Sequence, residues 1–116
     1  MVRMIVTFDN QDGVCVLRLQ GRFATGQDTD YLREKTEELK KQGCNKIVAD
    51  FADVSYIDST GIGFLIAIYT SVSKDGHGKF VLAGANRRVR EVLTLTKLDT
   101  IFSTYETLPD AVAALK

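Results

Sequence analysis

The chain has 116 residues, which is enough for one folded domain with one hydrophobic core and too few for two ordinary domains. Hydrophobic residues make up 45% of the sequence and charged residues 26%, a balance that excludes a disordered chain. Fifteen basic and fifteen acidic side chains cancel, so no net charge would draw the protein to nucleic acid or to an anionic membrane.

Signals for targeting and for metal binding are missing from the sequence. The N-terminal residues MVRMIVTF lack the apolar core of a signal peptide, and no apolar run approaches the about 18 residues of a membrane span, so we expect a cytoplasmic protein. Cys15 and Cys44 lie far apart without CxxC spacing, and His77 is the single histidine. This pattern predicts two reduced structural thiols, a surface histidine and no metal or other cofactor, and it argues against a disulfide or Cys-His catalysis.

The first part of the chain predicts a β-hairpin followed by a helix. Apolar residues alternate in residues 4–8 and 14–21, and Asp12-Gly13 supplies a turn between them, so we expect two paired strands with the second better buried. Residues 28–42 predict a polar helix that Gly43 ends as a C-cap. The thin apolar stripe of this helix consists of Tyr31, Leu32 and Leu39.

The middle of the chain combines a strand, a polar segment and an apolar helix. Residues 46–51 predict a short buried strand, residues 58–61 are polar, and residues 61–76 predict the helix. Its apolar stripe comprises Ile62, Leu65, Ile66, Tyr69 and Val72. Phe64, Ala67 and Ile68 lie off this stripe, so the helix is either buried on most sides or presents an apolar face to a partner.

The last part of the chain continues the alternation of strands and helices. Residues 79–84 predict a strand, residues 86–98 a helix with Asn86 as N-cap, and residues 100–106 a weak last strand. Residues 107–116 predict a C-terminal docking helix that starts at a Thr cap. This order predicts an α/β fold in one domain, residues 1–116, with a mixed sheet of four to five strands and about four helices.

The polar segment at residues 58–61, Asp-Ser-Thr-Gly, matches no enzyme motif in full. The aspartic-protease run is Asp-Ser/Thr-Gly, but here two hydroxyl residues precede the glycine. A serine-hydrolase elbow would need glycine where Ile57 stands, and a dinucleotide loop would need glycine where Ile66 stands. We therefore expect a protein that is not an enzyme.

Two other roles for the polar segment remain open. A side-chain oxygen of Asp58, Ser59 or Thr60 is placed to cap the following helix. A hydroxyl at a helix N-terminus is also a position where the helix dipole tolerates a phosphate. Phosphorylation would add about −1.5 to −2 charges beside Asp58 and an apolar binding surface, and this charge would repel a partner.

Three segments match the pattern of a known family: VADFADVSYIDSTGIGFLIAIY, GHGKFVLAG and NRRVREVLTLTKLDTIFSTYET. The first is similar to the family's strand, its Asp-Ser-Ser/Thr-Gly run and its Gly-x-x-x-Leu helix. With these segments the chain resembles, over nearly its whole length, the stand-alone STAS-domain proteins that act as anti-sigma factor antagonists in bacteria. The resemblance implies a STAS-like fold in a binding module.

The resemblance also implies a mechanism. The unphosphorylated protein would bind an anti-sigma factor, which is also a serine kinase of the histidine-kinase-like ATPase class, and so release a sigma factor. The phosphoacceptor serine falls on Ser59; its phosphorylation would dissociate the complex, and a serine phosphatase would reset it. The implied partner-binding residues are Asp58, Ser59, Thr60, Gly61, Ile62, Phe64, Leu65, Ile68 and Thr25.

One departure from the family's pattern lies at the end of the second predicted strand. The family often has Gly-Glu-Leu/Ile-Asp there, and this chain has Gly21-Arg22-Phe23-Ala24, so the acidic pair is replaced. The departure favours an alternative function, a STAS domain that is not switched at Ser59 and serves as a scaffold or as an accessory domain of a transporter or stress complex.

Overall fold

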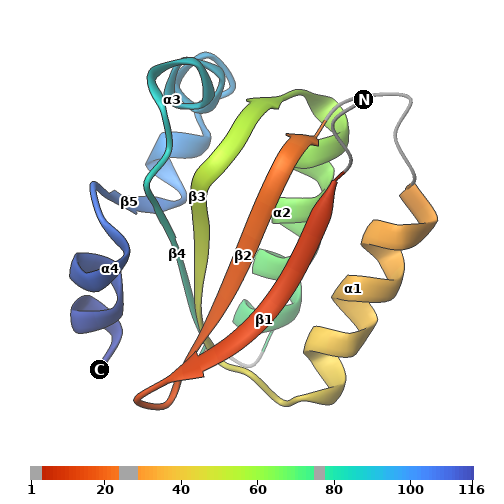
Figure 1. The fold of residues 1–116 in the computed structure, drawn as a ribbon, viewed down its shortest axis with the longest axis vertical. Helices are drawn as coiled ribbons and strands as arrows, with labels where there is room; N and C mark the ends of the chain where they lie inside the picture. The colour runs from red at the N-terminus through yellow and green to blue at the C-terminus, as the bar shows by residue number, and fades with distance from the viewer. Residues whose placement is uncertain (1–3, 24–28, 75–77) are drawn as a thin grey trace.

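A mixed five-stranded sheet forms the centre of the computed structural model, which describes residues 4–23, 29–74 and 78–116 (Figure 1). The first two strands form an antiparallel hairpin, and each later strand pairs in parallel with the one before it. The strands lie side by side in chain order: β1 (Ile5–Gln11), β2 (Val14–Phe23), β3 (Lys46–Ile57), β4 (Lys79–Ala83) and β5 (Ser103–Tyr105).

Helices cover both faces of this sheet (Figure 1). One face carries α1 (Thr29–Lys41) and α2 (Ser59–Ser73), which share the larger core with β2 residues such as Leu17 and Leu19. The opposite face carries α4 (Leu108–Leu115), which buries Ala111, Val112 and Leu115 against a valine-rich patch of the sheet. The remaining helix, α3 (Arg87–Leu95), also packs on the larger core. The predicted α/β fold with a mixed sheet and four helices is confirmed.

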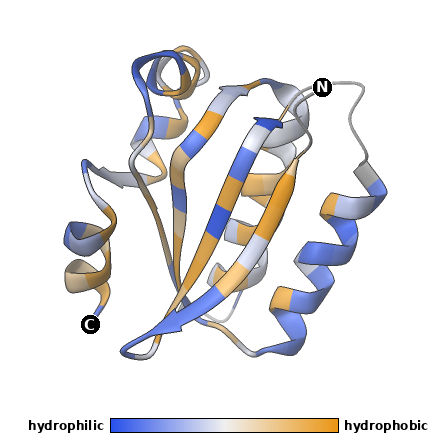
Figure 2. Cartoon of the chain, in the orientation of Figure 1, coloured by the Kyte–Doolittle hydropathy of each residue, from blue (hydrophilic) through white to orange (hydrophobic). Residues whose placement is uncertain are grey.

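Hydropathy follows this layering. In Figure 2, α1 is hydrophilic along most of its length, with few apolar positions, whereas apolar positions are frequent along the central strands. Of the α1 side chains, Leu32, Thr36 and Leu39 are buried, which matches two of the three residues of the predicted stripe; Tyr31 is half-buried. Within the described ranges of the chain, every helix is too short or too polar to cross a lipid bilayer.

β3 is twice as long as the sequence predicted. We expected a strand over residues 46–51, but β3 continues to Ile57 and brings the chain directly to Asp58. Its pairing with β2 has two register shifts, one between Arg18 and Gln20 and one between Gly21 and Arg22. Each shift puts an extra residue in β3 and reverses which side chains face the core. The alternation that marks a strand is therefore lost beyond residue 51.

α3 and the last strand are shorter than predicted. α3 ends at Leu95, and Lys97 adopts a left-handed backbone with φ of 61°. A short 3-10 turn, Leu98–Thr100, follows, and β5 spans only Ser103–Tyr105. The left-handed residue stops the helix because its φ is incompatible with helical geometry, although the apolar pattern continues beyond it.

The prediction of two reduced thiols is wrong for this structure, in which Cys15 and Cys44 form a disulfide. Their Cα atoms lie 6.2 Å apart, although 29 residues separate them along the chain. The parallel pairing of β2 with β3 places Cys15 opposite Ile47, only three residues beyond Cys44. Strand pairing, which no cysteine spacing reveals, therefore brings the two sulfurs together. His77 lies outside the described residues.

Candidate functional site

The polar segment forms the junction between β3 and α2, and Asp58 caps the helix. The Asp58 backbone is extended, and its Oδ1 accepts a hydrogen bond of 2.9 Å from the Thr60 backbone N–H. The Asp58 backbone N–H donates to the Phe23 carbonyl at the end of β2, at 3.0 Å. Capping, one of the two roles open for this segment, is thus observed, and Ser59 is the first residue of α2.

Gly61 fixes the start of α2 against the sheet. A Cβ atom added at this glycine would lie 2.5 Å from Ile57 Cγ1 and 2.9 Å from Phe23 Cβ. Both neighbours are at most 2% exposed, so they have little room to move. The backbone of α2 therefore approaches the ends of β2 and β3 more closely than any side chain would permit. This contact and the Asp58 hydrogen bonds hold Ser59 on rigid elements.

An uncharged exposed stripe runs along α2 from Ser59. Ser59, Gly63, Ala67 and Thr70 are exposed, Ile66 is 42% exposed, and Ile62 is half-buried. These positions recur at intervals of three and four residues and so share one side of the helix. No Asp, Glu, Lys, Arg or His occurs in the whole of α2. We call this surface the α2 stripe: Ser59, Ile62, Gly63, Ile66, Ala67 and Thr70.

Four of the residues expected to contact a partner are buried in the structure. Phe64 is 6% exposed, and Leu65 and Ile68 are each 1% exposed. Gly61 is also buried. Of the predicted apolar stripe, Leu65 and Val72 are buried, whereas Ile66 is exposed. Asp58, Ser59, Thr60 and Ile62 keep some exposed surface, and Thr25 lies outside the described residues.

A groove beside Ser59 was not predicted from the sequence. It has a volume of about 400 Å³ and lies between α1 and α2, with Ser59 and Thr60 at its α2 wall. The groove exists because Gly63 and Ala67, four residues apart on α2, leave space that Leu32 of α1 does not fill. The two small residues four positions apart were the one feature of the sequence that could have predicted this groove. We call this hollow the α1–α2 groove.

Charges near the groove are paired. Arg33 of α1 lies 3.6 Å from Asp30, and Lys40 lies 3.3 Å from Glu37, each pair being exposed and on the same helix. Exposed pairs of this kind contribute little to stability, about 0.2 to 0.5 kcal/mol each. The two ion pairs therefore balance the charge on the α1 side of the groove and leave the α2 stripe as its uncharged side.

Arg22, at the position where the family's acidic pair is replaced, points away from α2. Its guanidinium carbon lies 4.6 Å from the ring centroid of Tyr56, the residue opposite it in β3. Their chain neighbours Phe23 and Ile57 are in the core that α2 covers. Because successive side chains of a strand point to opposite faces, Arg22 and Tyr56 lie on the other face of the sheet. Ala24 lies outside the described residues.

The described residues offer no cluster of metal ligands. Among residues 4–23, 29–74 and 78–116, no three side chains of His, Cys, Asp or Glu are grouped so that they could hold a metal ion. The junction itself presents a hydroxyl at a helix N-terminus beside a capping carboxylate.

Comparisons with known proteins agree on one family. The model of the STAS domain family matches residues 6–111. A Thermotoga maritima protein, provisionally named an anti-sigma factor antagonist, is 38% identical over 80 residues, which span 69% of this chain and 70% of that protein. A crystal structure from the same organism, also provisionally named an anti-sigma factor antagonist, has a TM-score of 0.85 at 30% identity and covers 95% of this chain and 93% of its own.

A more distant likeness shows the shared fold alone. The Bacillus cell fate determinant SpoIIAA, solved in its phosphorylated form, has a TM-score of 0.72 at 19% identity and covers 97% of this chain and 100% of its own. The same fold thus persists where most residues differ.

Proposed function

The chain belongs to the STAS domain family, and from this membership we propose that it is an anti-sigma factor antagonist whose partner binding is switched by phosphorylation of Ser59. In this proposal residues 1–116 act as one STAS domain and not as an enzyme. The protein works in the cytoplasm and binds an anti-sigma factor, which releases a sigma factor. The names of its relatives and the geometry at Ser59 support the proposal.

The position of Ser59 carries this proposal. Its side chain is exposed at the end of the uncharged α2 stripe and directly follows Asp58. A phosphate there would bring about −1.5 to −2 charges to a surface that otherwise has none, whereas the dipole of α2 would stabilise it within the fold. Modification would therefore change partner binding strongly and protein stability little.

The reaction itself belongs to the partner. In the proposed cycle the anti-sigma factor is a serine kinase of the histidine-kinase-like ATPase class, which transfers the γ-phosphate of ATP to the Ser59 hydroxyl. The added charge then dissociates the complex. A serine phosphatase hydrolyses the phosphate and restores binding. The role of this chain is to hold the hydroxyl exposed on a rigid helix start.

Arg22 favours a second candidate function, an unswitched STAS scaffold. The family's acidic pair is absent at this position, and Arg22 stacks on Tyr56 on the face of the sheet opposite α2. A kinase that recognises a negative charge at the end of β2 would meet the positive charge of Arg22 there. In this alternative the domain binds a partner constitutively within a transporter or a stress complex.

Replacement of Ile66 by serine tests whether the α2 stripe binds the anti-sigma factor. We expect Ile66→Ser to weaken binding about tenfold, because contact with an apolar side chain of this size contributes about 1 to 2 kcal/mol. Ile5→Ser is the matched control, since Ile5 is also 42% exposed but lies on the edge strand β1. Titration calorimetry with the ATPase-class kinase of the same organism measures both. Equal losses for the two variants would reject the α2 stripe as the binding surface.

A further inference from the structure

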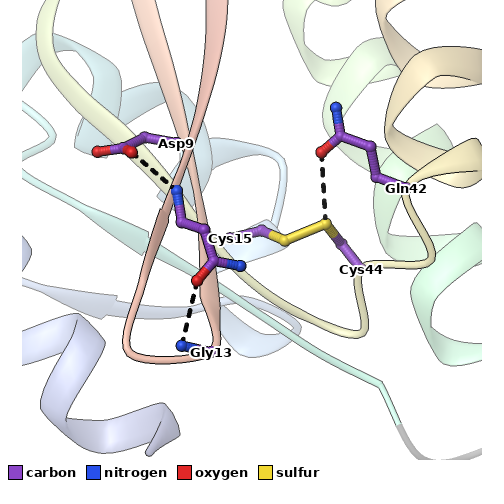
Figure 3. Close-up of a disulfide and its surroundings, with 6 residues drawn as sticks. Asp9, Gly13, Cys15, Gln42 and Cys44 are labelled. Atoms are coloured by element: carbon purple, nitrogen blue, oxygen red, sulfur yellow. Dashed lines mark hydrogen bonds between the residues drawn. A yellow bond between two sulfur atoms is a disulfide. The ribbon is translucent and has the colours of Figure 1, made fainter.

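We propose that the Cys15–Cys44 bond is a reversible disulfide that a dithiol reductant opens, and that this exchange controls how firmly the end of α1 is held on the sheet. Cys15 is the second residue of β2, and Cys44 lies between α1 and β3. The bond therefore ties the segment between α1 and β3 to the start of β2, beside the β1–β2 turn (Figure 3).

The bond is accessible to a reductant. Both cysteines line a cavity of about 460 Å³ that opens between the β1–β2 turn and residues 42–45. Cys15 is 8% exposed, whereas Cys44 is half-buried, so the Cys44 sulfur is the one an incoming thiolate would reach. Gln42 Oε1 lies 3.9 Å from this sulfur (Figure 3). A disulfide sulfur carries no proton, so Gln42 can accept a hydrogen bond there only after reduction.

A dithiol reductant of the thioredoxin class supplies the electrons and protons for this exchange. One thiolate of the reductant attacks the Cys44 sulfur, the bond between the two protein sulfurs breaks, and Cys15 leaves as a thiolate that takes up a proton. The second thiol of the reductant then breaks the mixed disulfide and releases Cys44, which is protonated in turn. The protein gains two electrons and two protons, and the reductant ends as a disulfide.

Besides this bond, α1 is held by three buried side chains, by Tyr31 and by Lys35, whose Nζ lies 5.8 Å from the centroid of the Phe8 ring of β1. The buried side chains of the helix are Leu32, Thr36 and Leu39, and Thr36 bonds within the helix to the Leu32 carbonyl at 3.0 Å. Near the N-terminal end, the Tyr31 hydroxyl accepts a hydrogen bond of 2.9 Å from the Val6 backbone N–H. At the C-terminal end, Leu39 and the disulfide join the helix to the sheet. Reduction removes the covalent link and leaves Leu39 and the chain connection through residues 42–45 to hold this end.

Release of this end would change the α1–α2 groove, which Lys40 and Glu37 line from α1. This last consequence, an effect of reduction on partner affinity, rests on the proposed function, whereas the exchange itself does not. In the proposed cytoplasmic setting, thiols are kept reduced and disulfides are usually transient. Formation of this bond under oxidising conditions would then change the shape of the α1–α2 groove beside Ser59.

The test measures the thiols and the helix in the purified protein without any partner. The protein is prepared without reductant, and alkylation in denaturant followed by intact mass counts the thiols before and after treatment of the native protein with dithiothreitol or a thioredoxin-class dithiol. We expect no alkylated thiol before treatment and two after it. Hydrogen exchange of residues 35–41 should accelerate at least tenfold on reduction, while exchange in α4, the internal control, stays within twofold.

Two variants keep the test decisive. Cys15→Ser with Cys44→Ser should show the fast exchange of residues 35–41 in every buffer, and Cys44→Ser alone should show it without any effect of dithiol. Two alkylated thiols in the untreated protein would overturn the proposal, as would a bond that resists dithiol in the native protein or exchange of α1 unchanged by reduction. None of these outcomes involves Ser59, so failure here leaves the proposed function standing.

Discussion

Replacement of Ser59 by aspartate should weaken binding of the anti-sigma factor at least about 100-fold. Aspartate places a negative charge at the end of the uncharged α2 stripe, next to Asp58. A like charge or a desolvated charge in an interface costs several kcal/mol, and each 1.4 kcal/mol is about a factor of ten in affinity. The same charge lies at the N-terminus of α2, where the helix dipole favours it, so the free energy of unfolding should stay within about 0.5 kcal/mol.

Two controls isolate the charge as the cause. Ser59→Ala removes the hydroxyl without adding charge and should keep binding within about threefold, which is less than 1 kcal/mol. Ser103→Asp adds the same charge at an exposed position of the edge strand β5 and should leave affinity unchanged. Titration calorimetry gives the affinities and urea unfolding gives the stabilities. A Ser59→Asp protein that loses stability but keeps its affinity would contradict the account.

Gly61→Ala should lower the free energy of unfolding by about 2 kcal/mol, although alanine favours helices more than glycine does. The new methyl group would lie 2.5 Å from Ile57 Cγ1 and 2.9 Å from Phe23 Cβ, inside van der Waals contact. Forcing extra atoms into a packed core typically costs about 1 to 3 kcal/mol. Relief requires α2 to move away from β2 and β3, which would displace Ser59 and weaken partner binding as well.

Gly63→Ala is the matched control in the same helix. A Cβ atom at Gly63 has no neighbour within 4 Å, so the substitution meets no obstacle. It should raise the free energy of unfolding by about 0.5 to 1 kcal/mol, the usual gain of alanine over glycine in a helix. Chemical denaturation of the two variants side by side gives the comparison. Equal effects of the two substitutions would show that Gly61 is not tightly packed.

Local patterns in the sequence predicted most of the fold. The turn at Asp12-Gly13, the cap at Asn86 and the Pro109 in the first turn of α4 each act on their immediate neighbours, and all three lie where expected. The length of β3 was underestimated because two register shifts with β2 interrupt its alternation. Those shifts depend on how two distant segments pair, which periodicity within one segment does not report.

The site was predicted less completely than the fold. The position of Asp58 and Ser59 at a helix start follows from their residue types, and the structure places them there. The buried side of α2 could not be chosen from its sequence, because apolar residues surround the helix. In the structure Gly61 approaches Phe23 and Ile57 closely, and Phe64 and Ile68 face inward on the same side while Ile66 faces outward.

The disulfide and the α1–α2 groove share one reason for being missed. Each is formed by two parts of the chain that come together only through tertiary packing. The disulfide links β2 with the segment after α1, and the groove is lined by α1 and α2. Cysteine spacing and helix periodicity describe single segments. Once β2 and β3 are paired in parallel, however, the neighbourhood of Cys15 and Cys44 follows from the register.

The central claim, that Ser59 carries the switch, is tested most directly by locating phosphate on the protein purified from its native cells. Intact mass followed by tandem mass spectrometry of the peptide from Ser55 to Tyr69 separates Ser59 from the nearby hydroxyls of Ser55 and Thr60. We predict a fraction of molecules with a single phosphate, on Ser59, whose size changes with growth conditions. An unmodified peptide under every condition, stress included, would contradict the switch and favour the unswitched scaffold.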